Sequence, residues 1–172
     1  EPQPHPQPQL RPPPRLEQLQ QRPIERRQDV LQIGEAFFEQ RRRPELDQSE
    51  TYEALTAYRR FLEDHPSSPM VSVAQERIVA CRERLAKKEF LGAQLYHRQG
   101  HLEAARMSYD QLLLSFPDTD WYLQGLAHLG LLERDEGGLE AARLHWQQVV
   151  DNTQDDELRA QVRGWLTDLD TP

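Results

Sequence analysis

Residues 85–117 constrain the fold more than any other stretch of this sequence. They read LAKKEFLGAQLYHRQGHLEAARMSYDQLLLSFP, with apolar residues at helical spacing on both sides of Gly100. Glycine interrupts a helical pattern, and Pro117 ends the second pattern because proline cannot continue a helix. The stretch is therefore expected to form two antiparallel helices joined by one turn.

The small and aromatic residues of this stretch follow an order typical of a tetratricopeptide repeat. Ala93 and Tyr96 precede the turn, Ala105 and Tyr109 follow it, and Pro117 closes the unit. Two helices approach closely only where small side chains face each other, so Ala93 and Ala105 are expected at the contact. The two tyrosines are expected to fill the space where the helices diverge. A single helix pair leaves one apolar face in water, so further pairs must stack on it.

Copies of this order lie before and after the central stretch. The earlier copy places small, aromatic, apolar and proline residues at Ala54, Tyr58, Phe61 and Pro66. The later copy begins 37 residues after Ala105 and places the first three at Ala142, Trp146 and Val149. A last helix over about residues 156–169 has apolar residues on one side and acids on the other, which is typical of a solvating cap. No alternating β-branched run predicts a strand.

These patterns predict a flexible arm over residues 1–23 and one all-α domain over residues 24–172. The domain is expected to be a tetratricopeptide-like helical-hairpin array, or α-solenoid, with one long helix. The arm holds most of the thirteen prolines, many alternating with glutamine, and too few aliphatic residues to fold alone. Alternatively, RPPPR at residues 11–15 presents a polyproline helix to an aromatic groove.

The sequence also predicts where several helices begin and end. A first helix begins near Ile24 and ends at Pro44. The long helix covers residues 69–99, about 46 Å at 1.5 Å per residue, unless a kink near Lys88 or Gly92 divides it. The expected N-caps are Ser49, Ser68 followed by Pro69 at the first helical position, and Asp118 or Thr119. Acids at residues 155–157 are expected to cap the last helix.

Charge is unevenly distributed along the chain. The net charge is −8, and residues 101–172 hold 14 acids and 5 bases, so nucleic acid is a poor partner. The segment 77–88 is basic, with Arg77, Arg82, Arg84, Lys87 and Lys88 against Glu83. It is expected to be a solvated helix face with a Glu83–Lys87 pair, or alternatively to meet an acidic protein or anionic head groups. No apolar run reaches about 18 residues, so no transmembrane segment is expected.

Residues able to support chemistry do not form a recognisable site. His97 and His101 are four residues apart, but Gly100 interrupts the helix between them, so no metal is expected. No Ser or Cys nucleophile sits in a glycine elbow, and no phosphate-binding loop is present, so neither catalytic nor cofactor-binding residues are expected. Cys81, the single cysteine, is expected to be a small buried apolar residue. The predicted function is binding, and an enzyme is not expected.

Three local features resemble the BamD family, lipoproteins of the outer-membrane β-barrel assembly machine. Phe37 and Phe38 precede the charged insertion RRRPELDQ, residues 84–87 with Glu89 form an RLAK-plus-acid segment in a long helix, and PDT follows at residues 117–119. The resemblance covers about residues 33–132, the family's C-terminal repeats. The sequence departs from the family because it has no acylated N-terminal cysteine, and the proline-rich arm stands where the family has its first two repeats.

The resemblance implies a non-catalytic scaffold in outer-membrane β-barrel assembly, at the periplasmic face of the outer membrane. The implied partners are the periplasmic domains of the barrel-forming assembly protein and the accessory lipoproteins. Membrane association is expected only through those partners or through an anchor absent from this sequence. Two alternatives stay open. One is another periplasmic adaptor of the TolA-associated division coordinator type, and the other is an accessory domain of an envelope enzyme.

A partner-binding surface is predicted on the solvent side of the central repeat. Glu103, Arg106 and Asp110 fall at spacings of three and four, which places them on one helix face, and Arg98 and Gln99 lie at the adjoining turn. The alternative is a solvated face with ordinary ion pairs. On either view, replacing Arg106 with Glu is expected to leave the melting temperature nearly unchanged, because the small and aromatic packing contacts remain.

Overall fold

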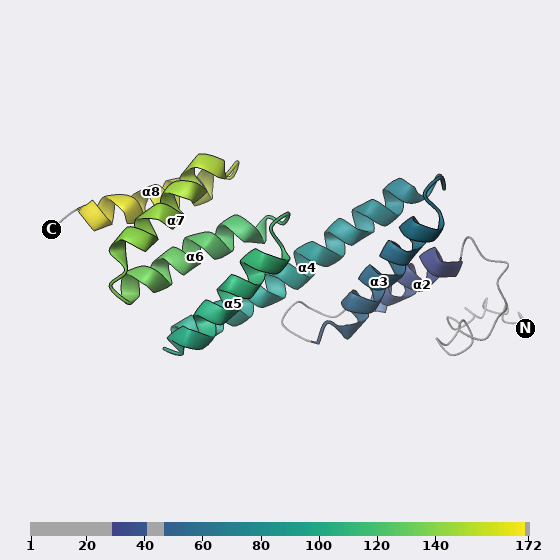
Figure 1. Cartoon of the computed structure of the whole chain (residues 1–172), viewed down its shortest axis with the longest axis horizontal. Coiled ribbons are helices and arrows are strands. Elements are labelled where there is room, and N and C mark those ends of the chain that lie inside the picture. Colours follow the sequence, from purple (N-terminus) through teal and green to yellow (C-terminus); the bar gives the residue numbers. More distant parts are fainter. Residues whose placement is uncertain (1–28, 41–46, 171–172) are drawn as a thin grey trace, which may run out of the picture.

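The structure is a computed structural model that describes residues 29–40 and 47–170, and this part of the chain consists of helices with no strand (Figure 1). The helices are α2 (Asp29–Gln40), α3 (Ser49–Asp64), α4 (Val71–Arg98), α5 (Leu102–Ser115), α6 (Trp121–Asp135), α7 (Leu139–Asn152) and α8 (Asp156–Asp170). The predicted all-α, tetratricopeptide-like array is confirmed. The arm over residues 1–23, the helix start at Ile24 and the helix end at Pro44 lie outside the described residues.

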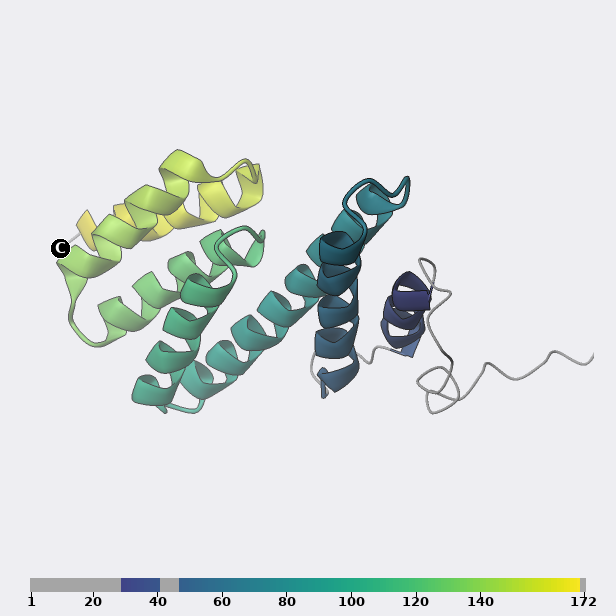
Figure 2. The ribbon, with the colours of Figure 1, turned by 45° about the vertical axis from the view of Figure 1, so that its right-hand side comes forward.

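The helices pack as successive antiparallel hairpins. Helices α2 and α3, α4 and α5, and α6 and α7 form the pairs, and α8 packs against α7. The pairs follow one another along the long axis of the molecule, as Figures 1 and 2 show from two directions. Each pair covers the apolar side of the next, so the array buries faces that a lone hairpin would expose to water.

Helix α4 is a single helix of 28 residues, about 42 Å long at 1.5 Å per residue. The expected long helix is therefore confirmed in its unbroken form, and Gly92 lies within it without ending it. Helix α3 packs beside the N-terminal part of α4, and α5 packs beside its C-terminal part (Figure 2). Helix α4 thus contacts both its own partner α5 and the second helix of the preceding hairpin.

The turns after α4 and α6 have the same backbone geometry. After α4, the Gly100 N–H donates to the His97 carbonyl (3.0 Å) and the His101 N–H donates to the Tyr96 carbonyl (2.9 Å), which is a Schellman motif. Both hydrogen bonds recur around Gly137 after α6. The two glycines have φ values of 77° and 86°, a region that side-chain-bearing residues rarely adopt. Glycine therefore ends both helices, as the sequence predicted for Gly100.

The three predicted N-caps are wrong. The structure has Gln48, Met70 and Asp120 in those places. The expected hydroxyls bond within the preceding turns instead: Ser49 donates to Asp47 (3.0 Å), Ser68 accepts from the N–H two residues on (3.2 Å), and Thr119 donates to the Phe116 carbonyl (2.9 Å). Serine and threonine stabilise turns by the same bonds that cap helices, so their presence alone does not fix the first helical residue. At α8, the acidic cap is confirmed, because Asp155 accepts from two backbone N–H groups of the first turn (2.9 and 3.1 Å).

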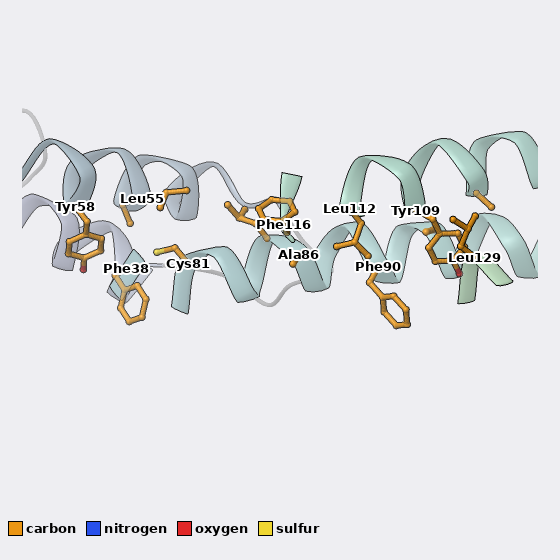
Figure 3. Close-up of a cluster of buried hydrophobic side chains, with 14 of the residues drawn as sticks. Phe38, Leu55, Tyr58, Cys81, Ala86, Phe90, Tyr109, Leu112, Phe116 and Leu129 are labelled. Carbon is orange, nitrogen blue, oxygen red and sulfur yellow. The ribbon is translucent and has the colours of Figure 1, made fainter. Parts of the chain in front are cut away.

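Two clusters of buried side chains form the core. The first runs from α2 to α6 and includes Phe38, Tyr58, Phe90, Tyr109 and Phe116 (Figure 3). The second is centred on Trp146 and joins α6, α7 and α8. Helix α6 contributes to both clusters and so connects them. Cys81 is fully buried in the first cluster, as predicted.

The small residues pack as the sequence predicted, but one of the two tyrosines does not. Ala93, Ala105 and Tyr109 are fully buried, whereas Tyr96 is 41% exposed. Phe90 packs against Tyr109 instead, with ring centroids 6.4 Å apart. The reason lies in the length of α4: helix α3 covers the other end of α4, so no described helix reaches Tyr96 from the preceding hairpin.

Candidate partner-binding surface

The five predicted partner-binding residues lie at the end of α4 and on α5. Arg98 and Gln99 end the long helix and are exposed. Glu103 and Asp110 are also exposed, because the opposite side of α5 carries the residues packed against α4. Their role in partner binding stays a prediction.

Arg106, the fifth residue, does not share this free face. Its guanidinium group reaches α6, where Nη1 lies 3.4 Å from Glu133 Oε1 and Nη2 bonds to Glu136. The hydrogen bond to Glu136, followed by that to Glu133, raises the pKa of Arg106 above its ordinary value. Arg106 therefore belongs to the contact between α5 and α6.

Glu133 is the centre of a small ionic network across three helices. Its side chain is only 11% exposed, and its second carboxylate oxygen lies 2.8 Å from Nδ1 of His145 on α7. Arg143, 37 residues after Arg106, makes the corresponding contact further along the array, with Asp170 of α8 (2.6 Å). Arginine at this position thus links the second helix of a hairpin to the following helix in both places.

Replacing Arg106 with Glu is expected to lower the free energy of unfolding by about 1 to 3 kcal/mol. The new carboxylate would face Glu133 and Glu136, and Glu133 is too buried for water to screen the repulsion fully. This corrects the expectation of unchanged melting, which assumed an outward-facing side chain. Urea denaturation of the Arg106→Glu variant measures the loss, with Glu103→Arg on the exposed side of α5 as the matched control. Equal stability of variant, control and wild type would return Arg106 to a solvated face.

The basic segment of α4 is not the solvated face that the sequence predicted. Arg77 pairs with Glu35 of α2 (2.8 Å), and its guanidinium carbon lies 4.5 Å from the centre of the Phe38 ring. Arg84 donates to the side-chain oxygen of Gln48 (3.0 Å). These bases hold the first hairpin against α4, so their charges are already engaged within the chain.

The next bases of the segment hold the loop before α6. Arg82 donates to Asp118 through Nε (2.7 Å), and this contact lowers the pKa of Asp118. The predicted Glu83–Lys87 pair is wrong: Glu83 accepts from the Asp120 N–H (3.0 Å), and Lys87 lies over the Trp121 ring (5.4 Å). Arg82, Glu83 and Lys87 contact the loop and α6 because both pack on α4. Helical spacing alone does not reveal these contacts.

The two histidines considered as metal ligands have different surroundings. His97 pairs with Asp135 of α6 (3.1 Å), while His101 is exposed in the turn. Within the described residues, no group of three or more His, Cys, Asp or Glu side chains is placed to hold a metal ion. Each described helix is also too short or too polar to cross a lipid bilayer.

His128 is a half-buried polar residue that the sequence did not single out. It lies among the rings of Phe90 (5.0 Å between centroids), Tyr109 (6.4 Å) and Trp165 (6.1 Å), with Gln94 Nε2 3.3 Å from its Nε2. Burial, and then the nearby His97, lower the pKa of His128 to about 4. The imidazole is therefore neutral near pH 7 and joins α4, α5, α6 and α8.

Residues 24–145 match the family described as YfiO, outer membrane lipoprotein. No curated protein matches the chain. The matched range includes the first three hairpins up to the middle of α7 and covers more than half of the chain.

Proposed function

The chain belongs to the YfiO family of outer membrane lipoproteins, and from this premise we propose that it is a BamD-like, non-catalytic scaffold in outer-membrane β-barrel assembly. In this role the array docks onto the periplasmic part of the assembly complex, at the periplasmic face of the outer membrane. Its partners are the barrel-forming assembly protein and accessory lipoproteins. The family match over residues 24–145 is the observation that carries the proposal.

The internal contacts of the array support a scaffold role. Salt bridges and aromatic contacts join α2 to α4, α4 to α6, α5 to α6, and α7 to α8, so the hairpins hold fixed positions relative to one another. Side chains that these contacts do not use, such as Arg98, Gln99, Glu103 and Asp110, form the proposed partner surface. A preorganised surface loses less conformational entropy on binding than a mobile one.

Affinity purification from envelope extracts, with the full chain as bait, tests the proposal. Recovery of the barrel-forming assembly protein is the expected result. Recovery of a division complex or of a peptidoglycan enzyme, without the barrel-forming protein, would replace the proposal by one of its two alternatives.

Substitution of the proposed surface residues sharpens that test. The double variant Arg98→Glu, Asp110→Arg is expected to lower recovery of the barrel-forming protein several-fold while its melting temperature stays within about 2 °C of wild type, because neither side chain supports the fold. Glu63→Arg, an exposed acid at the other end of the array, is the matched control and should leave recovery unchanged. Equal recovery with all three baits would contradict the surface assignment.

A further inference from the structure

Helices α5 and α7 carry similar outward-facing patterns of acidic and large apolar side chains. We call these patterns the outer stripes. The outer stripe of α5 consists of Glu103, Met107, Asp110, Gln111 and Leu114, and that of α7 consists of Glu140, Leu144, Gln147, Gln148 and Asp151. The two sets occupy the same positions 37 residues apart, in the segments that begin LEAAR. The residue types agree at Glu103 and Glu140, Met107 and Leu144, and Gln111 and Gln148, so this part of the pattern is repeated in two consecutive hairpins.

The apolar members of the outer stripes are unusually exposed. Leu114 is 80% exposed, Met107 71% and Leu144 70%, the highest values among the large exposed apolar side chains in the described part of the chain. Met107 and Leu114 are seven residues apart, which places them two turns apart, about 10 Å, on the same side of α5. The packed side of each helix is complete without them, since its core residues are fully buried. The core of this chain therefore does not account for these side chains.

The charged side chains of the outer stripes are all acidic, and Arg143 is a base that interacts with one of them, Glu140, through its charge. Arg106 and Arg143 belong to the same two helices, but their guanidinium groups turn to Glu136 at the end of α6 and Asp170 on α8. Among the described residues, no ion pair joins a Lys or Arg to Glu103, Asp110, Glu140 or Asp151. The face that exposes the large apolar side chains is thus negatively charged.

We propose that the outer stripes dock a basic amphipathic helix of a protein partner. Such a helix has large apolar residues two turns apart, which cover Met107 and Leu114, and Lys or Arg beside them, which meet Glu103 and Asp110. Anionic lipids and nucleic acids carry the wrong charge for this face. This inference deepens the proposed function. The docking of a basic helix does not depend on that function, and only the identity of the partner protein rests on the proposed function.

Two synthetic 18-residue helical peptides serve as probes. Both carry leucines at one helical face, and the flanking positions hold lysines in one peptide and glutamates in the other. Fluorescence anisotropy with the full chain is expected to detect binding of the lysine peptide only, weakening as salt screens the charges. The triple variant Met107→Ser, Leu114→Ser, Leu144→Ser should lower the affinity at least about tenfold, since it removes the apolar anchors. Glu103→Gln with Asp110→Asn should lower it several-fold and flatten the salt dependence.

Matched controls separate the outer stripes from general acidity and exposed apolar surface. Val79→Ser with Leu95→Ser removes exposed apolar side chains of α4, and Glu63→Gln with Glu76→Gln removes exposed acids elsewhere. Both double variants are expected to bind the lysine peptide like wild type. Affinity lost equally in controls and stripe variants would overturn the proposal, as would tight binding of the glutamate peptide. The proposal would also fail if the wild type forms a dimer that the triple variant abolishes, because a second copy of the chain would then occupy the outer stripes.

The peptide result and the affinity purification are independent. A chain that binds the lysine peptide through the outer stripes, yet never retains the barrel-forming protein, keeps this inference and contradicts the proposed function. A chain that retains the barrel-forming protein but binds the lysine peptide equally well in wild type and triple variant keeps the proposed function and contradicts this inference.

Discussion

Replacing Gly130 with alanine is expected to lower the free energy of unfolding by about 3 kcal/mol. A Cβ added at Gly130 would lie 2.8 Å from Cδ1 of Trp146, so the indole would have to move. Trp146 is fully buried and its Nε1 donates to the Ala127 carbonyl (2.9 Å). The change therefore overpacks a closed core and strains a buried hydrogen bond, and each effect costs about 1 to 3 kcal/mol.

Urea denaturation followed by tryptophan fluorescence measures this loss. Gly164→Ala on α8 is the matched control, because no described atom beyond the adjacent residues and the backbone of α8 itself lies within 4 Å of its added Cβ. That control should gain up to about 1 kcal/mol from helix propensity. Gly130→Ala combined with Trp146→Phe should be less destabilised than the two single changes predict, since the smaller ring leaves room for the methyl group. Equal stability of both glycine variants would show that α6 and α7 do not approach as described.

Acidification from pH 6.5 to pH 4 is expected to remove about 3 kcal/mol of stability through His128 alone. The unfolded chain protonates this imidazole near its ordinary pKa of 6.5, whereas in the folded chain burial lowers the pKa to about 4. Between these values the unfolded state binds more protons, so stability is full above pH 6.5 and falls as the pH drops toward 4. A shift of about 2.5 pKa units corresponds to about 3 kcal/mol.

Denaturation midpoints measured between pH 7.5 and pH 4 test this dependence. His128→Phe keeps a ring among Phe90, Tyr109 and Trp165 but cannot be protonated, so its stability should vary much less with pH over this range. His101→Gln, at an exposed histidine, should follow the wild type. If wild type and His128→Phe lose the same stability on acidification, the carboxylates and not His128 cause the loss.

The sequence predicted those parts of the fold that depend on local pattern and on pairs of neighbouring helices. The order of small, aromatic and proline residues identified the hairpins because Ala93, Ala105 and Tyr109 meet within one helix pair. The prediction for Tyr96 was wrong because the burial of this side chain depends on the preceding hairpin, and the long α4 moves α3 away from it. Packing between successive hairpins is not contained in the pattern of either hairpin alone.

The candidate site was predicted less well for a similar reason. Helical spacing places Arg106 on the same face as Glu103, but a long side chain can reach the adjacent helix, and here Glu133 and Glu136 attract it. One signal in the sequence could have shown this. LEAAR occurs at residues 102–106 and again at 139–143, and an arginine repeated at one position between hairpins suggests a contact that each hairpin makes with the next.

The continuity of α4 affects how the array unfolds. In a regular solenoid each repeat interacts with its neighbours through an interface, and the array can open one interface at a time. Here α3 and α5 both pack on one uninterrupted helix, and Arg77 and Arg82 in the N-terminal half of α4 pair with Glu35 before it and Asp118 after it. The segment from α2 to α5 therefore behaves as one cooperative block, while α7 and α8 are attached to it through α6 and open more independently.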